Sequence, residues 1–520
     1  MLKRVGKMTN QKGELELPRE TLISNAISAE TFGGKIHIEW NPDAEVTPIG
    51  QLPFFIQYLK LGHLFKPWVE ESPLTYTSNN APRKVDVLGS FLLSILAGHK
   101  RYAHMTSLMS DRVNTKLLGM TKVVSDDSAR RALKRIVEAA GVEWLQKHLQ
   151  YCYAPLLQED WILDCDTTIK PLYGSQQGAE VGYNPRKPGR PSHTYHTYMM
   201  ANLRLVLDVE VQSGTKAAAC YSSPGLWDLL DRIPQVHWPR LIRGDCDWGN
   251  EEILREAEHR GVGYLFKVRQ SKYVKGLIHK LHFEPGWEKT QDGWEAIESR
   301  LQLKSWTCER RVVVIRRQLT GDIVALPESP RQLKEGQQQL AFIEAAPDMK
   351  AYEYAVLVTS LCEEVLTISQ LYRDRADCEN VFDEMKNQWG WSGFVTQDIK
   401  RCRLTARMIA LVYNWWNLFV RLAVPDKHLE AITSRPLLLH GIGKLSHHSG
   451  KQTLTITQCH GRHQDVMAAY QRMSRFFTRL KRIAPQLSPI ECWYRILSEA
   501  VKKYLRGRQL HPPNLIGSPA

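Results

Sequence analysis

Apolar residues recur with helical spacing toward both ends of the chain and with strand-like spacing between them. Residues 85–150 contain two segments in which apolar positions lie three or four residues apart, which is the spacing of one buried helix face. Ser125 or Asp126 stands before the second segment, and either side chain can cap a helix. These segments predict a small helical domain that is compatible with a helix-turn-helix. Four basic residues are expected on the exposed side of its second helix: Arg130, Arg131, Lys134 and Arg135.

Between residues 161 and 270 the pattern changes to short apolar runs and helical segments. The runs WILDCDTTI, MMANLRLVLDVEVQSG (two strands), PRLIRGDCD and GYLFKVR are strand-like, whereas SSPGLWDLLDRI and NEEILREAEHRG are helical. Three strands, helix, strand, helix, strand is the order of a ribonuclease H-like α/β fold. The first and fourth strands of such a sheet are neighbours. Both are predicted to end in carboxylates, at the sheet edge where open α/β sheets carry functional groups.

The remaining segments complete a prediction of five regions in an α/β protein. Alternating runs such as RRVVVIRRQ and YEYAVLVTS predict a β-rich insertion, RLTARMIALVYNWWNLFVRLAV predicts a long apolar helix, and the tail is helical and basic. In chain order, we predict a mostly helical DNA-binding region, the first part of the core, the insertion, the last core helices, and a basic helical region for DNA binding or dimerisation. Their ranges are 1–155, 156–275, 276–369, 370–425 and 426–520.

The composition favours a globular cytoplasmic protein. Its hydrophobic fraction of 43% suffices for packed cores, and no run of 18 apolar residues predicts a membrane span. The first twenty residues lack the apolar core of a secretory signal. The ten cysteines are scattered and none forms a C-x-x-C pair. That distribution argues against a zinc ribbon or a disulfide framework.

The excess positive charge is confined to the end of the chain. Residues 400–520 contain 20 Lys and Arg against 5 Asp and Glu, whereas residues 1–399 contain 49 against 50. Aromatic residues are interleaved with the basic ones, as in proteins that bind nucleic acid. We expect this end to bind a polyanion, most simply DNA, because Lys and Arg that neutralise phosphates release counterions.

The segment LYRDRADCENVFDEMKNQWGW combines four kinds of chemistry on one predicted helix. A phenol, a guanidinium, a carboxylate and an ammonium fall within an arc of roughly 60°: Tyr372, Arg375, Glu379 and Lys386. The adjoining arc is apolar, which places this stripe at the rim of a buried face. Ion pairs on a solvated helix would explain the stripe taken alone, so its interpretation depends on carboxylates elsewhere in the chain.

Three carboxylates are expected to converge. Asp166 and Asp245 end the first and fourth strands, and Glu379 lies on a helix that can pack across them. Carboxylates this close raise one another's pKa unless cations lie between them, and oxygen ligands select Mg²⁺ or Mn²⁺. Two such ions about 4 Å apart activate a water or 3′-hydroxyl for phosphodiester displacement. Phosphates would be held by the other members of the stripe, Tyr372, Arg375 and Lys386.

Each strand end also offers a second aspartate. Asp164 is two residues from Asp166, and Asp247 is two residues from Asp245, so both members of a pair can face the same side. Asp166 is preferred because it directly precedes two threonines, and Asp245 because it ends the apolar run. Asp164 and Asp247 remain alternatives as metal ligands.

These elements resemble bacterial insertion-sequence transposases of the DDE class with the YREK signature. LDCDTT, GYNPRKPGRPSH, IRGDCDWGNEE and the complete Y-x2-R-x3-E-x6-K occur in the family's order, within about residues 85–420. The resemblance implies a ribonuclease H-like core with a β insertion, two Mg²⁺ ions, a homodimeric synaptic complex, and double-stranded DNA of terminal inverted repeats as substrate. Asp166, Asp245 and Glu379 match the catalytic triad. The DNA- and phosphate-contacting positions are matched by Tyr372, Arg375 and Lys386.

At three places the resemblance leaves the role of a residue open. Asp247 stands where related sequences often have glycine or a small residue. In some relatives an aromatic side chain of the insertion stabilises a flipped base; the candidates here are Trp287, Trp294 and Trp306, for which core packing is the simpler role. The segment YNPRKPGRP is similar to a minor-groove hook. Its basic residues would contact the DNA backbone unless the segment is only a flexible loop: Arg186, Lys187 and Arg190.

The sequence therefore predicts a cytoplasmic, nucleoid-associated transposase that cuts and joins DNA. It would bind the terminal repeats of its own element, cleave at the ends and join them to target DNA by two-metal hydrolysis and transesterification. Two alternatives remain: a domesticated transposase kept as a DNA-binding protein, and a ribonuclease H-like nuclease without strand transfer.

Overall fold

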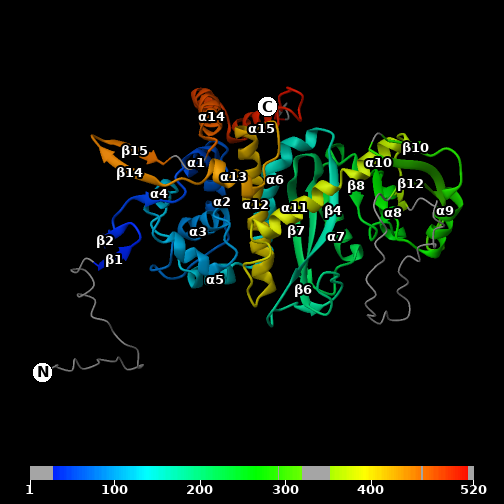
Figure 1. The fold of residues 1–520 in the computed structure, drawn as a ribbon, viewed down its shortest axis with the longest axis horizontal. Helices are drawn as coiled ribbons and strands as arrows, with labels where there is room; N and C mark the ends of the chain where they lie inside the picture. The colour runs from blue at the N-terminus through cyan, green and yellow to red at the C-terminus, as the bar shows by residue number, and fades with distance from the viewer. Residues whose placement is uncertain (1–26, 291, 319–351, 458–460, 513–520) are drawn as a thin grey trace, which may run out of the picture.

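A large mixed sheet and a helical half make up the part of the chain that the computed structural model describes, which is residues 27–290, 292–318, 352–457 and 461–512 (Figure 1). The sheet has ten strands. They are β4 (Ile162–Pro171), β5 (Glu180–Val181), β6 (Pro191–Met200), β7 (Leu205–Ser213), β8 (Leu241–Gly244), β9 (Tyr264–Lys267), β10 (Glu288–Lys289), β11 (Trp294–Leu301), β12 (Arg310–Gln318) and β13 (Tyr352–Thr359).

The strand order is β10-β11-β12-β13-β9-β8-β4-β6, and both β5 and β7 pair with β6. β8 runs parallel to β4 and to β9, whereas β6 is antiparallel to β4 and to β7. The strands predicted as an insertion do not form a separate sheet. They extend the core sheet, because β13 pairs antiparallel with β9. Residues 319–351 of the predicted insertion lie outside the described residues.

The prediction that the first strand ends at Asp166 is wrong. β4 continues to Pro171 because β6 pairs with it along its whole length, from Leu163 opposite Met200 to Pro171 opposite Ser192. The parallel neighbour β8 is much shorter and ends at Gly244. Asp166 therefore lies just beyond the last residue that pairs with β8, where one side of β4 is no longer covered by a neighbouring strand.

Alternation along β4 separates the two faces of the sheet. Ile162 packs in one apolar cluster with α10 (Val365–Arg373), whereas Leu163 and Cys165 belong to the main core on the other side. Asp164 and Asp166 have the parity of Ile162 and so face α10 and the helix that follows it, α11 (Ala376–Asn387). The opposite face carries α7 (Ala219–Asp231), with α8 (Glu251–Arg260) and α9 (Lys272–His282) further along the sheet.

The helical half lies beside β7 and is joined to the sheet by α12 (Figure 1). Its helices are α1 (Leu52–Leu61), α2 (Phe65–Glu70), α3 (Lys84–Leu96), α4 (Arg112–Leu117), α5 (Asp126–Arg135), α6 (Glu138–Tyr153), α12 (Ile399–Ala423), α13 (Ala431–Leu438), α14 (His463–Ile483) and α15 (Pro489–Ala500). α12 is the predicted long apolar helix, buried along almost its whole length. It packs on β7 and α6.

Local signals for the helical half are confirmed in part. Ser125 caps α5 by accepting a hydrogen bond from the Ser128 amide at 3.3 Å. The tail was predicted to be helical, but it also contains strands. A hairpin of β14 (Gly443–His448) and β15 (Lys451–Ile456) pairs with β3 (Val46–Thr47). A second hairpin comprises β1 (Ile27–Thr31) and β2 (Gly34–Ile38). Within the described ranges, no helix is long and apolar enough to cross a membrane.

Candidate active site

Asp164 is held in a buried ion pair and is not available as a ligand. Its carboxylate accepts hydrogen bonds from Arg243 Nε at 2.7 Å and Nη2 at 2.8 Å. The side chains of Asp164 and Arg243 are 1% and 2% exposed, and the two residues stand opposite each other in the parallel ladder of β4 and β8. The third arm of the guanidinium donates to the carbonyl of Leu371 at the end of α10. This pair ties both central strands to the helix above them.

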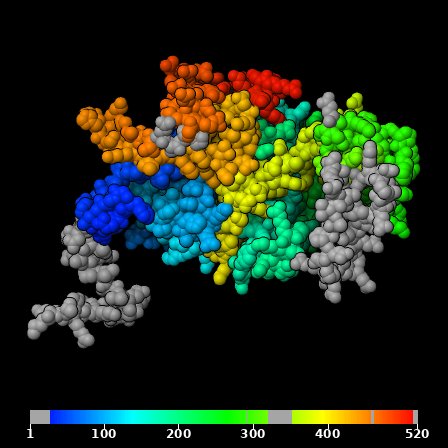
Figure 2. Space-filling model, in the orientation of Figure 1, coloured from blue at the N-terminus to red at the C-terminus, as the bar shows by residue number. Residues whose placement is uncertain are grey.

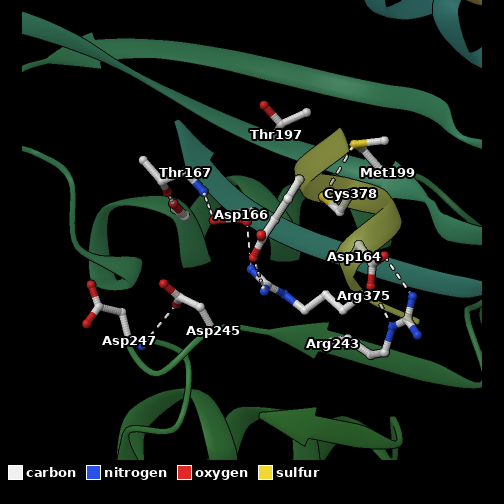
Figure 3. A network of polar contacts seen from close by, with 12 residues as sticks. Asp164, Asp166, Thr167, Thr197, Met199, Arg243, Asp245, Asp247, Arg375 and Cys378 are labelled. Carbon is white, nitrogen blue, oxygen red and sulfur yellow. Dashed lines mark hydrogen bonds and ion pairs between the residues drawn. The ribbon is translucent and has the colours of Figure 1, made fainter. Parts of the chain in front are cut away.

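Asp166 makes a different kind of pair, at the centre of the candidate site (Figure 3). Its Oδ2 accepts a hydrogen bond from Arg375 Nη2 at 2.6 Å, and the Nη1 atom of the same guanidinium lies 3.4 Å from Glu379 Oε1. Arg375 is 7% and Asp166 14% exposed, but the Glu379 side chain is 68% exposed. One guanidinium therefore bridges the first and third predicted carboxylates, one from the sheet and one from the helix.

The four-residue stripe does not lie on one straight helix, as the sequence predicted. α10 ends at Arg373 and α11 begins at Ala376, with Arg375 at the N-cap position. Between them the Arg375 and Cys378 amides bond three residues back, to the carbonyls of Tyr372 and Arg375. This tighter turn redirects the chain. It moves Arg375 from the predicted rim into the buried space above Asp166.

Burial governs the ionisation of the central carboxyl. It raises the pKa of Asp166 to about 7 against the opposing effect of Arg375, and the negative charges of Asp245 and Glu379 raise that pKa further. Thr167 fixes its orientation by donating its amide to Asp166 Oδ1 at 2.7 Å. On the other face of the sheet, the Thr167 hydroxyl lies 2.9 Å from Nδ1 of His196. The pKa of this fully buried imidazole is lowered to about 4 by burial, so it is neutral.

Asp245 follows β8 directly, and its negative charge, like that of Glu379, raises the pKa of Asp166. Asp166, Asp245 and Glu379 together are called the carboxylate cluster. The pKa of Asp245 is raised, chiefly by burial, and its Oδ1 accepts the amide of Asp247 at 3.0 Å. Asp247 forms an ion pair with the exposed Arg269, and its carboxylate points away from Asp166 (Figure 3). Of the two aspartates after β8, Asp245 is thus the one whose charge affects Asp166. This geometry favours Asp245 over Asp247 as the second ligand.

Tyr372 and Lys386 both lie near enough to Asp166 for its charge to affect their pKa values. Burial raises the pKa of the Tyr372 phenol to about 12, and Asp245 and Asp166 are among the charges that it senses. Burial lowers the pKa of Lys386, and the neighbouring Arg186 lowers it further, against the opposing charge of Asp166. All four positions of the stripe therefore interact electrostatically with Asp166, although Tyr372 lies on α10 and Glu379 and Lys386 lie on α11.

The predicted hook places further basic groups next to Lys386. Arg186, Lys187 and Arg190 are exposed on the loop between β5 and β6. The Lys187 ammonium contacts the hydroxyl of Tyr173, and the Arg190 guanidinium stacks over the same ring at 4.8 Å. These contacts fix the positions of two of the three side chains. The third, Arg186, lies near enough to Lys386 to lower the pKa of that lysine.

The tryptophans of the insertion are all partly or fully packed. Trp306 is buried. Trp287 is covered by the Arg316 guanidinium at 3.7 Å, and Trp294 lies between Arg317 and Arg373 at 5.0 and 5.6 Å. Trp294 is thus the one that reaches α10, beside the candidate site.

Comparison with known proteins identifies the family of this chain. A family model described as "Transposase DDE domain group 1" matches residues 76–476. The chain belongs to this transposase family. The matched segment contains every carboxylate and every basic residue of the candidate site. The predicted DDE transposase class is thereby confirmed.

The other comparisons are less informative. None of the curated proteins matches the sequence. Among solved structures, the chain is similar to one described as the cryo-EM structure of a piggyBac transposase synaptic complex with hairpin DNA, at 10% identity and a TM-score of 0.39, covering 91% of this chain and 87% of that one.

Sequence reasoning missed one residue that defines the site of this transposase. Arg243 decides which aspartate of β4 remains available, because it neutralises Asp164 and leaves Asp166 to Arg375. A signal was present in the sequence: IRGD places an arginine two residues before Asp245, on the same face of its strand. Recognising the pair required the register of β8 against β4, which the sequence alone does not reveal.

Proposed function

We propose that this transposase cleaves and joins DNA with Asp166, Asp245 and Glu379 as its catalytic carboxylates. The observation that carries the proposal is the convergence of Asp166, Asp245 and the Arg375–Glu379 pair at one edge of the sheet. The strand order β7-β6-β4-β8-β9, with β6 antiparallel and β8 parallel to β4, supports a ribonuclease H-like core. In that fold the first and fourth strands carry the first two acidic residues side by side.

The donor set fits divalent cations by its chemistry. All three groups are carboxylates, and the buried Asp166 has a raised pKa that a cation would relieve. As the side chains stand, the described residues contain no three His, Cys, Asp or Glu side chains close enough to hold a metal ion, and the Arg375 guanidinium occupies the space between Asp166 and Glu379. We infer that Asp166, Asp245 and Glu379 hold Mg²⁺ or Mn²⁺ once Glu379, which is exposed, turns inward.

Bound Mg²⁺ would activate a water or 3′-hydroxyl and stabilise the leaving oxygen. The chain's own residues position the substrate. Arg375 keeps the carboxylates at one place and offers a second guanidinium edge to a phosphate. Lys386 and the loop of Arg186, Lys187 and Arg190 provide basic groups along which a DNA backbone can lie. The Tyr372 phenol is protonated, because burial raises its pKa to about 12, and its hydroxyl can donate a hydrogen bond to a phosphate oxygen.

Further aspects of the proposal extend to the biology of the element. We propose that the substrate is double-stranded DNA with terminal inverted repeats, that two copies act together in a synaptic complex, and that the protein is of the bacterial insertion-sequence type and acts in the cytoplasm at the nucleoid. The YREK-like spacing and the basic groups of Lys386 and this loop support these inferences. A domesticated DNA-binding protein and a nuclease without strand transfer are the alternatives.

One experiment separates these possibilities. The purified chain is incubated with Mg²⁺ and linear DNA that carries its own gene with the flanking sequence. A transposase yields cleavage at the flanks and joined donor–target product, a plain nuclease yields only cleavage, and a DNA-binding protein yields neither. Glu379→Gln should abolish cleavage but retain DNA binding. Cleavage that persists in this variant would refute the assignment of Glu379.

A further inference from the structure

α14 presents a row of arginines on the side opposite its packing surface. The buried face of this helix packs against α1 and α12 through Val466, Ala469, Tyr470, Met473, Phe477 and Leu480. At about 100° per residue, four exposed arginines fall within an arc of about 80° centred on the far side: Arg472, Arg475, Arg479 and Arg482. The row spans roughly 15 Å along the helix at about 1.5 Å per residue.

These four charges are not neutralised within the part of the chain that the structure describes. None of them forms an ion pair with a described carboxylate, and the sequence contains no Asp or Glu from Val466 to Ile490. The exposed residues between the arginines, such as Ser474 and Thr478, are polar hydrogen-bonding groups. The row is therefore a concentrated positive surface on a rigid, well-packed helix.

The basic helix α5 provides the contrast within the same molecule. Arg130 lies 2.8 Å from Asp126 and 2.6 Å from Asp127, and Arg131 lies 3.3 Å from Asp127. The Arg135 guanidinium stacks over Tyr76 at 5.6 Å. Two of the four basic side chains of α5 are thus paired with carboxylates of the same helix, whereas none of the four arginines of α14 pairs with a described carboxylate.

The length and charge of the row suit a duplex backbone. Duplex DNA carries about one negative charge per 1.7 Å of its axis when both strands are counted, so 15 Å of duplex contains roughly nine phosphates. Guanidinium, serine and threonine groups are the usual donors to phosphate oxygens, and such contacts position a protein without reading sequence. The row offers no exposed aromatic or amide group at its centre that would read a base edge.

We propose that Arg472, Arg475, Arg479 and Arg482 bind the phosphate backbone of duplex DNA independently of sequence, at a second site outside the catalytic centre. The inference rests on the proposed function only in taking DNA as the substrate. α14 lies on the helical half, away from β4 and α11, and forms a ridge of the molecular surface (Figures 1 and 2). DNA held there would be a stretch of duplex beyond the cleaved phosphate.

The test compares two variants with the same change in charge. The first replaces the four α14 arginines with glutamine; the matched control replaces Arg130, Arg131, Lys134 and Arg135 on α5. Binding to a 40-base-pair duplex of arbitrary sequence is measured by fluorescence anisotropy in EDTA, across a series of salt concentrations. Circular dichroism and thermal melts verify that both variants fold, and an Arg→Lys version of the α14 quartet provides a charge-preserving variant.

The α14 variant is expected to bind the duplex about 10- to 100-fold more weakly near 0.15 M salt. The slope of log Kd against log salt concentration should fall by about 3 to 4, since each lost phosphate contact lowers that slope by about 0.9. The α5 variant should lose less affinity and a smaller part of the slope than the α14 variant, because two of its four charges are already paired within the helix. The lysine version should recover most of the slope. Equal losses in both quartets, or an unchanged slope in the α14 variant, would overturn the inference. So would α14-dependent binding to anionic lipid vesicles without any effect on DNA.

This test is independent of catalysis. Because it is done in EDTA, no cleavage is needed, and Glu379→Gln should bind the duplex like the unaltered chain. A chain that fails to cleave DNA but shows α14-dependent binding would contradict the proposed function and uphold the inference. A chain that cleaves but binds equally well without the four arginines would do the reverse.

Discussion

Asp164 and Asp166 lie two residues apart on the same face of the same strand, and each is paired with an arginine, yet their environments differ. The Arg243–Asp164 pair is bidentate, almost fully buried and anchored to the end of α10. The Arg375–Asp166 pair has one short contact and is shared with the exposed Glu379. A carboxylate whose oxygens are all satisfied by one guanidinium is structural. We infer that Asp166, which shares its guanidinium with Glu379, is the carboxylate that accepts a cation.

The largest difference between the two aspartates should appear in catalysis. Asp166→Asn removes one metal-ligand charge and should reduce DNA cleavage by about a thousandfold, which corresponds to roughly 4 kcal/mol of lost transition-state stabilisation. The melting temperature should change less than in Asp164→Asn, because Arg375 keeps Glu379 as a second anionic partner. Single-turnover cleavage with saturating protein measures the effect. Asp247→Ser is the control: it should stay within about threefold, and a loss as large as that of Asp166→Asn would make Asp247 the second ligand.

The converse substitution should affect stability. Asp164→Asn leaves Arg243 buried without its anionic partner, and we expect the free energy of unfolding to fall by about 3–5 kcal/mol. Denaturant titration measures this loss, and cleavage per folded molecule should remain within a few-fold. The double variant Asp164→Leu with Arg243→Met should recover much of the stability, because it removes both charges together. An unchanged stability of Asp164→Asn would show that this pair is not structural.

The sharing of Arg375 between two carboxylates can be tested next. Arg375→Gln removes the group that positions Asp166 and Glu379, and cleavage should fall by about 10- to 100-fold, the usual range for a residue that orients metal ligands. Its neighbour Arg373 is the matched control, because it pairs with Asp292 outside the carboxylate cluster. Arg373→Gln should change cleavage by less than about threefold. Equal effects of the two substitutions would remove any special role of Arg375.

The smallest expected effect is a pH dependence of cation binding. Asp166 has a pKa of about 7 without metal, so protonation competes with the cation below that pH. Mn²⁺ should bind about tenfold more weakly at pH 6 than at pH 8, the ratio of deprotonated Asp166 at these two values. Titration followed by electron paramagnetic resonance measures the affinity directly. A pH-independent affinity, or the same profile in Asp166→Asn, would exclude Asp166 as the titrating ligand.

The structure places Arg375 between Asp166 and Glu379, and the charge of Asp245 raises the pKa of Asp166. The catalytic role of these three carboxylates stays a prediction. Strand alternation and chain order, which depend on local patterns, could be read from the sequence. The end of β4 was misplaced because its length is determined by pairing with β6, a long-range contact. The break before α11 has no Gly or Pro to mark it, and it coincides with the contact of Arg375 to a strand about two hundred residues earlier in the chain.

For charge, too, the sequence shows local patterns, and only the structure shows which side chains pair. The sequence located the basic end of the chain correctly, and it also marked α5 as a basic helix. Only the structure shows that Asp126 and Asp127 neutralise arginines of α5 and that the arginines of α14 align on one exposed side. Counts of charged residues identify a basic region, but ion pairing within the fold determines which of its charges remain available to a partner.

The most direct test of the account changes the metal preference at each aspartate of β4. Asp166→Cys replaces a hard oxygen ligand with a softer thiolate, which Mg²⁺ binds poorly and Mn²⁺ tolerates better. We predict that DNA cleavage by this variant is lost in Mg²⁺ and partly restored in Mn²⁺, whereas Asp164→Cys shows no such difference between the two metals. Restoration by Mn²⁺ in Asp164→Cys but not in Asp166→Cys would contradict the assignment of Asp166 as the catalytic carboxylate.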